Sequence, residues 1–88
     1  MSKYLIITRE RDYISSSKNI KNHILKTNGN GVMIYNKEGV LINSAKRTEK
    51  GKIIVYGGMF YDGEPRQWVV DFIKNNKDGT EVEDAALL

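Results

Sequence analysis

The chain has 88 residues, of which 40% are hydrophobic and 28% are charged, and its formal net charge is +3. This length suits one domain, and this balance is typical of a soluble globular protein and not of a disordered one. The absence of cysteine excludes disulfides, thiolate catalysis and cysteine-bound zinc. No apolar run exceeds four residues, far below the ~20 of a membrane helix. We therefore expect a cytoplasmic protein without cofactor, metal site or membrane span.

Charge is distributed unevenly along the chain. Residues 1–50 carry ten lysines and arginines against four acids, whereas residues 51–88 carry four against seven. Such asymmetry bears on partners and not on the fold. It is compatible with binding to nucleic acid, with binding to an acidic protein surface and with head-to-tail self-association.

The first part of the chain predicts a strand followed by a helix. Residues 3–8 are apolar on both faces and rich in β-formers, which favours a strand covered from two sides. Charged residues 9–12 interrupt it. Three serines then offer capping hydroxyls to a helix that ends near residue 27, and three apolar residues share one helical face. The serines are Ser15, Ser16 and Ser17, and the apolar residues are Ile20, Ile24 and Leu25.

Three further strands are predicted at residues 32–35, 40–45 and 52–61. Two turn sequences separate them, Asn-Lys-Glu-Gly at 36–39 and Thr-Glu-Lys-Gly at 48–51. Each turn ends in a glycine that can adopt positive φ, so we expect an antiparallel meander. Gly57 and Gly58 interrupt the last strand and favour a bulge or a bend there.

A second helix is expected to open within residues 62–65, because acids suit the positive end of the helix dipole and proline suits the first turn. Its apolar stripe contains Trp68, Val69, Phe72 and Ile73, with the tryptophan as a core anchor. The acidic residues 80–88 are expected to form a flexible C-terminal tail.

Together these elements predict a single α+β domain over residues 1–79 in the order β-α-β-β-β-α. Its four-stranded sheet would contain the antiparallel three-stranded meander, with two helices. The first strand, at 3–8, could lie parallel to the second through a right-handed crossover, or antiparallel to an edge of the meander. The sequence leaves both placements open.

The aromatic end of the last meander strand is a candidate protein interface. Its residues are Tyr56, Met59, Phe60 and Tyr61. Strand alternation sends about half of them to each face of the sheet. On an uncovered face they would form an apolar patch suited to a protein partner or to a second copy in a homodimer. Simple core packing and base stacking are the alternatives.

The second turn carries a dense group of positive charges, for which phosphates would be the natural counterpart. This nucleic-acid candidate consists of Lys46, Arg47, Lys50 and Lys52, with Lys18, Lys21 and Lys26 of the first helix as further contacts. An ordinary solvated hairpin is the alternative interpretation.

A third candidate is an anion or nucleotide site at the junction of the first strand and the first helix, where guanidinium groups, hydroxyls and backbone amides could meet an anion. Its residues are Arg9, Arg11, Ser15, Ser16 and Ser17. No glycine-rich loop precedes the helix, and helix capping beside solvated arginines is the alternative. His23 has no evident nucleophile or orienting carboxylate and is expected at the core boundary.

No cluster of residues has the spacing of a known catalytic chemistry, so we expect a protein that acts by binding and is not an enzyme. The leading hypothesis is a small modulator or inhibitor of another protein, such as an accessory protein of a virus or a mobile element. The alternative is a nucleic-acid-binding protein that uses the basic hairpin.

Overall fold

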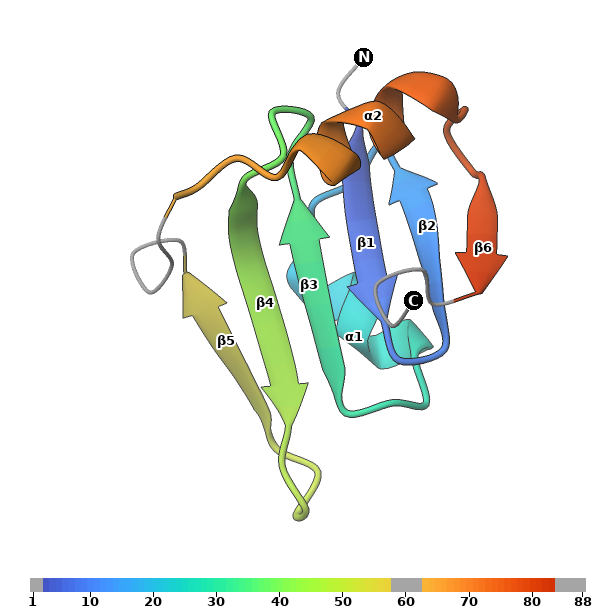
Figure 1. The fold of residues 1–88 in the computed structure, drawn as a ribbon. Helices are drawn as coiled ribbons and strands as arrows, with labels where there is room; N and C mark the ends of the chain where they lie inside the picture. The colour runs from blue at the N-terminus through green and yellow to red at the C-terminus, as the bar shows by residue number, and fades with distance from the viewer. Residues whose placement is uncertain (1–2, 58–62, 84–88) are drawn as a thin grey trace.

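The computed structural model describes residues 3–57 and 63–83, which form one sheet and two helices (Figure 1). The order of elements is β-β-α-β-β-β-α-β. In chain order they are β1 (Tyr4–Thr8), β2 (Arg11–Ser15), α1 (Ile20–Lys26), β3 (Gly31–Tyr35), β4 (Leu41–Arg47), β5 (Ile53–Gly57), α2 (Gln67–Asn75) and β6 (Glu81–Glu83).

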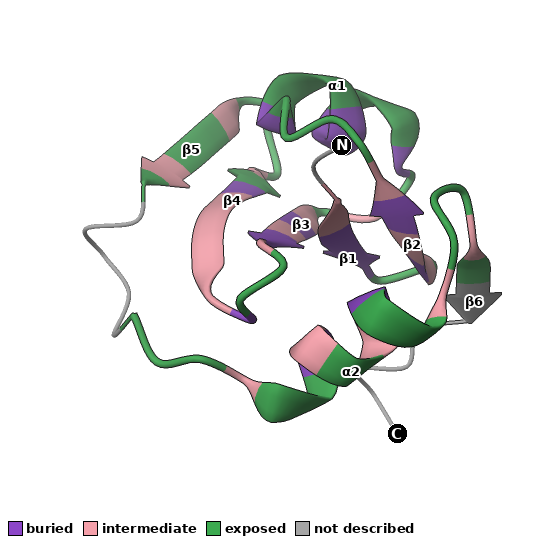
Figure 2. Ribbon diagram, turned by 90° about the horizontal axis from the view of Figure 1, so that it is seen from above, coloured by how far each residue is buried: buried purple, intermediate pink, exposed green. Residues whose placement is uncertain are grey.

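The strands are arranged in the order β5-β4-β3-β1-β2-β6, and each neighbouring pair is antiparallel. Figure 1 shows α1 behind the sheet and α2 across one end of its front face. Seen from above in Figure 2, the sheet lies between the two helices, and β5 lies well away from α2. A small α+β domain with two helices and an antiparallel meander is therefore confirmed.

The sheet has more strands than the four that the sequence predicts. It contains five strands of five to seven residues and the three-residue β6. β2 is absent from the predicted order because its charged side chains obscure its alternation. Asp12 and Ile14 are buried, whereas Arg11, Tyr13 and Ser15 are partly exposed, as period-two alternation requires.

The structure also decides where β1 lies. It pairs antiparallel with β3, the edge of the meander, so that Leu5 lies opposite Tyr35 and Ile7 opposite Met33. Its other side pairs with β2. β1 is thus central and buried from both faces, as its continuous apolar run predicts.

Helix α1 begins later than predicted. Its N-cap is Asn19, whose side chain accepts a hydrogen bond from the Asn22 amide at 3.3 Å. The expected cap Ser15 belongs to β2 instead. Leu25 is 67% exposed and does not belong to the buried face of the helix. That face consists of Ile20, His23 and Ile24.

The two predicted turns are confirmed, and both close in the same way. Gly39 and Gly51 each have a φ of +83°. The Asn36 side chain accepts hydrogen bonds at 3.0 Å from two amides of its turn, and the Thr48 hydroxyl accepts one at 3.0 Å from the Lys52 amide. The register shift in the meander lies at Ile34/Tyr35 and not at Gly57. Gly58 lies outside the described residues.

Helix α2 begins at Gln67, after the proline, with Arg66 as its N-cap. The Arg66 amide donates to the Gly39 carbonyl at 2.9 Å, so the first turn of the meander anchors the start of this helix. Val69 and Ile73 are buried as predicted, but Trp68 is 44% exposed and is not a core anchor. Its ring lies against Tyr35, with ring centroids 6.2 Å apart.

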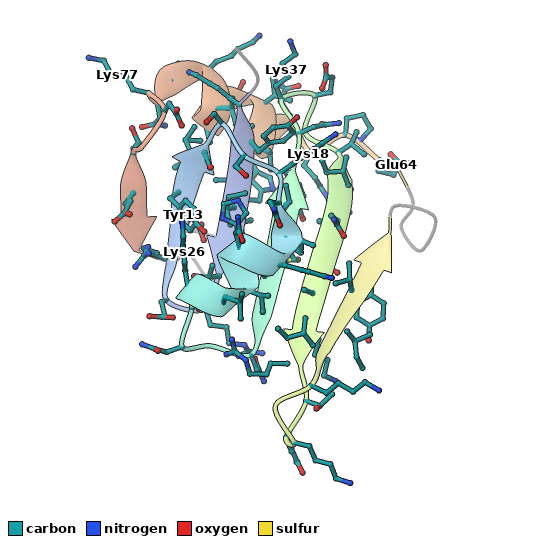
Figure 3. All side chains as sticks on the ribbon, turned by 180° about the vertical axis from the view of Figure 1, so that it is seen from behind. Tyr13, Lys18, Lys26, Lys37, Glu64 and Lys77 are labelled. Atoms are coloured by element: carbon teal, nitrogen blue, oxygen red, sulfur yellow. The ribbon has the colours of Figure 1, made fainter. Side chains whose placement is uncertain are left out.

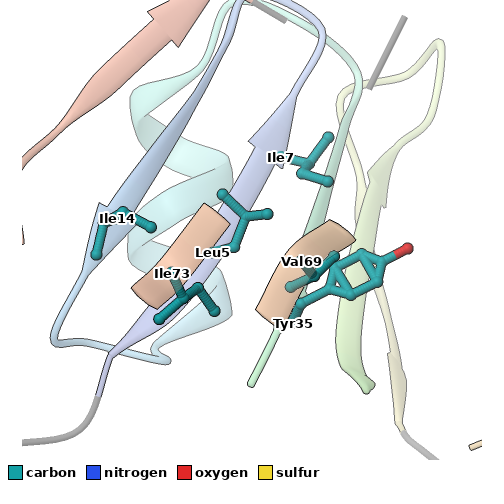
Figure 4. Close-up of a cluster of buried hydrophobic side chains, with 6 residues drawn as sticks. All are labelled: Leu5, Ile7, Ile14, Tyr35, Val69 and Ile73. Carbon is teal, nitrogen blue, oxygen red and sulfur yellow. The ribbon is translucent and has the colours of Figure 1, made fainter. Parts of the chain in front are cut away.

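Each face of the sheet carries its own hydrophobic cluster. On the α2 face the buried residues are Leu5, Ile7, Ile14, Tyr35, Val69 and Ile73 (Figure 4). On the α1 face they are Ile6, Ile20, Ile24, Val32, Ile34 and Ala45. Two small cores thus share one sheet, because side chains of successive strand residues point to opposite faces.

Strand β6 lies in the acidic segment that the sequence assigns to the flexible tail. Tyr13 lies opposite Glu81, and Ile14 exchanges backbone hydrogen bonds at 2.9 Å with Gly79 and Thr80. These contacts join the described part of the segment, residues 80–83, to the edge of the sheet. The sheet therefore ends in β6 on one side and in β5 on the other.

Candidate functional site

Strand β5 is an edge strand with an exposed apolar sequence. Its residues 53–56 are Ile-Ile-Val-Tyr, and Ile54 and Val55 are 38% and 42% exposed. Of the four, only Ile53 packs against a described core cluster. The reason is positional: β4 pairs with one side of β5, and β5 ends one side of the sheet. A continuous apolar edge of this kind can pair with another chain.

The backbone of β5 presents half of its polar groups outward. In an antiparallel pair, residues alternate between those that hydrogen-bond to the partner strand and those that face away from it. The Thr48 amide donates to the Lys52 carbonyl at 2.8 Å, which fixes this alternation. Ile54 and Tyr56 therefore face β4, whereas the N–H and C=O groups of residues 53, 55 and 57 face away.

On the α2 face, one row of side chains crosses four strands beyond the end of the helix. Ile7 lies opposite Met33, Met33 opposite Ser44, and Ser44 opposite Tyr56. This row forms the floor of an open hollow of about 580 Å³. We call it the sheet hollow. It exists because the main contacts of α2 with the sheet are made with β1, while β5 lies well away from the helix (Figure 2).

The rim of the sheet hollow is positively charged. Arg9 lies on the β1–β2 turn, and Lys46 projects from β4; both are exposed and line the hollow. Lys46 also lines a second hollow of about 680 Å³, together with Lys50 and Lys52. Of the described residues that line these two hollows, Glu49 is the one acid. Arg9 and these three lysines therefore border the open part of the sheet.

The structure does not bring all of the predicted nucleic-acid-binding residues together. Lys46, Lys50 and Lys52 lie together, but Lys18 lies at the other end of the sheet, near Lys37 (Figure 3). The seven residues of β4 separate these ends by about 20 Å. Lys21 and Lys26 are exposed on α1, on the opposite face from the sheet hollow.

Arg47 has a structural role. Its guanidinium donates to the carbonyls of Ile24, Thr27 and Gly29, at 2.8, 3.3 and 2.9 Å. These carbonyls lie at and just beyond the end of α1, where backbone acceptors lack partners in the helix. Arg47 therefore caps the helix, and its side chain is directed away from a phosphate on the hairpin surface.

The anion-site residues are also separated. Arg9 and Arg11 lie near the β1–β2 turn, whereas Ser15 lies at the other end of β2, about 13 Å from Arg11. Arg11 lies 3.6 Å from Glu81 and over the ring of Tyr13. The hydroxyls of Ser15 and Ser17 accept hydrogen bonds from amides two residues later. The serine hydroxyls at this junction thus stabilise the chain's own backbone.

His23 is 3% exposed and belongs to an internal network (its partner Tyr13 is labelled in Figure 3). Its Nε2 lies 2.8 Å from the Ser17 carbonyl and must donate to it, so Nδ1 accepts from the Tyr13 hydroxyl at 2.7 Å. Burial lowers the pKa of His23 and raises that of Tyr13, which favours both neutral forms. This arrangement is structural, because both ring nitrogens are occupied.

Glu10 is a structural residue that the sequence does not reveal. Its carboxylate accepts hydrogen bonds from the Thr27 hydroxyl and from the amides of Asn28 and Gly29, which follow α1. The Thr27 hydrogen bond is the largest cause of the lowered pKa of Glu10. Since these partners lie 17 to 19 residues away along the chain, no local pattern signals them.

Within residues 3–57 and 63–83, no group of three histidine, cysteine or acidic side chains could hold a metal ion. None of the helices in this part of the chain is long and apolar enough to cross a bilayer. Of the predicted protein-interface residues, Tyr56 lines the sheet hollow. Met59, Phe60 and Tyr61 lie outside the described residues.

Comparison with protein-family models, with curated proteins and with solved structures finds no match for this chain.

Proposed function

We propose that this chain is a non-enzymatic protein-binding domain whose sheet hollow takes an acidic, extended segment of another protein. The observation that supports this proposal is the pairing of an apolar floor with a cationic rim. Ile7, Met33 and Tyr56 supply the floor, and Arg9 and Lys46 supply the rim. An extended segment that alternates apolar and acidic side chains matches both features, because it can bury one set and direct the other to the rim.

The floor supplies affinity and the rim supplies specificity. Tyrosine and methionine are enriched at protein interfaces because they bury large, adaptable apolar surfaces. A lysine or arginine at the rim mainly accelerates association and excludes cationic segments. This division predicts that floor and rim substitutions change binding in different ways.

The test is selection from a random 12-residue peptide library displayed on phage, with the folded domain immobilised. We expect enrichment of peptides that combine acidic with apolar residues. Lys46→Glu should remove the acidic preference, and Tyr56→Ser should abolish enrichment. Lys77→Glu, a substitution on an exposed residue next to β6, is the matched charge control and should select the same peptides as the wild type.

Two outcomes would contradict the proposal. One is the absence of any enriched sequence on a domain shown to be folded. The other is the same enriched set on wild-type protein and on Tyr56→Ser, because binding would then use another surface.

Nucleic-acid binding is the second candidate, and the cluster of Lys46, Lys50 and Lys52 favours it. A labelled 20-nucleotide single strand tests it. Each phosphate that a lysine neutralises on a single strand adds about −0.7 to the slope of log affinity against log salt concentration. Three lysines would give a slope of about −2, and Lys50→Glu would make it shallower. A peptide held on the apolar floor would depend much less on salt.

A further inference from the structure

We propose that β5 pairs antiparallel with β5 of a second copy, about a two-fold axis at Val55, to form one continuous sheet across a homodimer. This inference goes beyond the proposed function, since it uses the edge of the sheet and not the sheet hollow. It rests on the outward backbone groups of β5, on its side-chain sequence and on the position of its charges.

The two edges of the sheet differ in how well they are protected against pairing with another chain. Monomeric proteins protect edge strands with short length, charged side chains, proline or bulges. β6 has three residues and carries the exposed, charged Glu81. β5 has five residues and none of these devices: no charge, no proline, and a regular register with β4 from residue 53 to residue 57. The unprotected edge is therefore β5.

The outward groups of β5 are self-complementary. They belong to residues 53, 55 and 57, which lie symmetrically around Val55. An antiparallel copy centred there places Val55 opposite the partner's Val55, and Ile53 opposite the partner's Gly57. Opposed residues of this type exchange two hydrogen bonds, so every outward N–H and C=O of β5 gains a partner. A C2 axis makes the contact closed and equal for both copies.

The side chains fit the same register. Ile54 would meet the partner's Tyr56 on the α2 face, and the two Val55 side chains would meet on the α1 face. Aromatic with β-branched pairs and β-branched pairs are favourable across strands. Among the described residues other than its chain neighbours, none has a heavy atom within 4 Å of the position that a Cβ at Gly57 would take, which leaves room for the partner's Ile53.

The charges select this antiparallel arrangement. Lys52 directly precedes β5, three residues from the axis, so the two Lys52 residues would lie about 20 Å apart. This separation exceeds the ~8 Å Debye length at physiological salt. A parallel arrangement would instead place the two Lys52 residues side by side. Both sheet hollows would open on the same side of the joined sheet, with the partner's Ile54 beside each Tyr56.

Sedimentation velocity over a range of concentrations tests the proposal. A single pair of edge strands buries a small interface, so we expect a reversible dimer whose dissociation constant is on the order of micromolar or weaker. Val55→Pro removes the outward N–H and should give a monomer. Proline is tolerated on an edge strand where its nitrogen faces solvent. Val55→Thr keeps the N–H and the branched side chain and should still dimerise.

Val55→Lys, a second disruptive variant, places like charges at the axis and should also give a monomer. Amide NMR or circular dichroism establishes that each variant is folded. A wild-type protein that stays monomeric up to about 500 micromolar would overturn the proposal. So would folded Val55→Pro and Val55→Lys proteins that dimerise like the wild type, or open-ended polymers, which indicate a head-to-tail contact between β5 and β6.

Each of the two proposals can be refuted without refuting the other. The Val55→Pro monomer keeps the row from Ile7 to Tyr56, so peptide selection on it reports the sheet hollow without the dimer. Loss of peptide binding in a protein that still dimerises would overturn the proposed function alone.

Discussion

The two faces of the sheet are closed to different extents. On the α1 face, the helix packs over β3 and β4. Arg47 and Glu10 form hydrogen bonds with the backbone at and just after its C-terminal end. On the α2 face, the helix packs over β1 and leaves the row from Met33 to Tyr56 open. One face is therefore built mainly for stability, and the other keeps apolar surface available. The difference locates the candidate binding surface.

The largest expected effect comes from breaking the anchor of α2. A Cβ at Gly39 would lie 2.5 Å from the Arg66 carbonyl oxygen, and the residue has positive φ. Gly39→Ala should therefore reduce the free energy of unfolding by about 3 kcal/mol, from backbone strain and displacement of the helix start. Urea unfolding measures the loss.

Gly51→Ala is the matched control for this substitution. Gly51 has the same φ of +83°, but, its chain neighbours apart, no residue in the described part of the chain has a heavy atom within 4 Å of its Cβ position. Its cost should be only the strain of about 1 to 2 kcal/mol. Equal losses for both glycines would show that the contact between the first turn and α2 contributes little.

A smaller loss of stability is expected from removing the side chain that caps α1. Arg47→Ala leaves the carbonyls of Ile24, Thr27 and Gly29 without this donor. Hydrogen bonds from charged donors contribute about 1.5 to 3 kcal/mol, and we expect a loss of about 2 kcal/mol in urea unfolding. The neighbouring Lys46→Ala, on the other face, should change stability by less than about 0.5 kcal/mol. A larger loss of stability for Lys46→Ala than for Arg47→Ala would contradict the assignment of Arg47 as the stabilising cation.

The smallest effect concerns the buried histidine of the α1 face. Burial, assisted by the charge of Lys26, lowers the pKa of His23 in the folded protein. The unfolded chain therefore binds a proton at higher pH than the folded one, and stability falls as the pH drops below about 6.5. We expect this loss as the pH falls through and below about 6.5 in the wild type and a flatter profile in His23→Gln, measured by urea unfolding. A profile equally steep in both would assign the loss to other groups.

Much of the candidate site lies beyond the reach of sequence reasoning. The chain order shows that Tyr56 lies on a late strand and that Lys46, Lys50 and Lys52 cluster at a turn. It does not show that Ile7 and Met33 share a row with Tyr56, because that row depends on the register of three strand pairs. Arg47 has the same local context as Lys46 but points to the opposite face.

The sequence alone determines the local features of this protein. The meander, its two glycine turns and the apolar residues at the centre of each helix follow from backbone sterics and side-chain periodicity, which act over a few residues. The tertiary structure decides the rest: β2 in place of a helix start, β6 at the edge, an exposed Trp68, and a face that α2 leaves open. These features depend on which distant segments pair and pack, and the gain from such contacts outweighs weak local preferences.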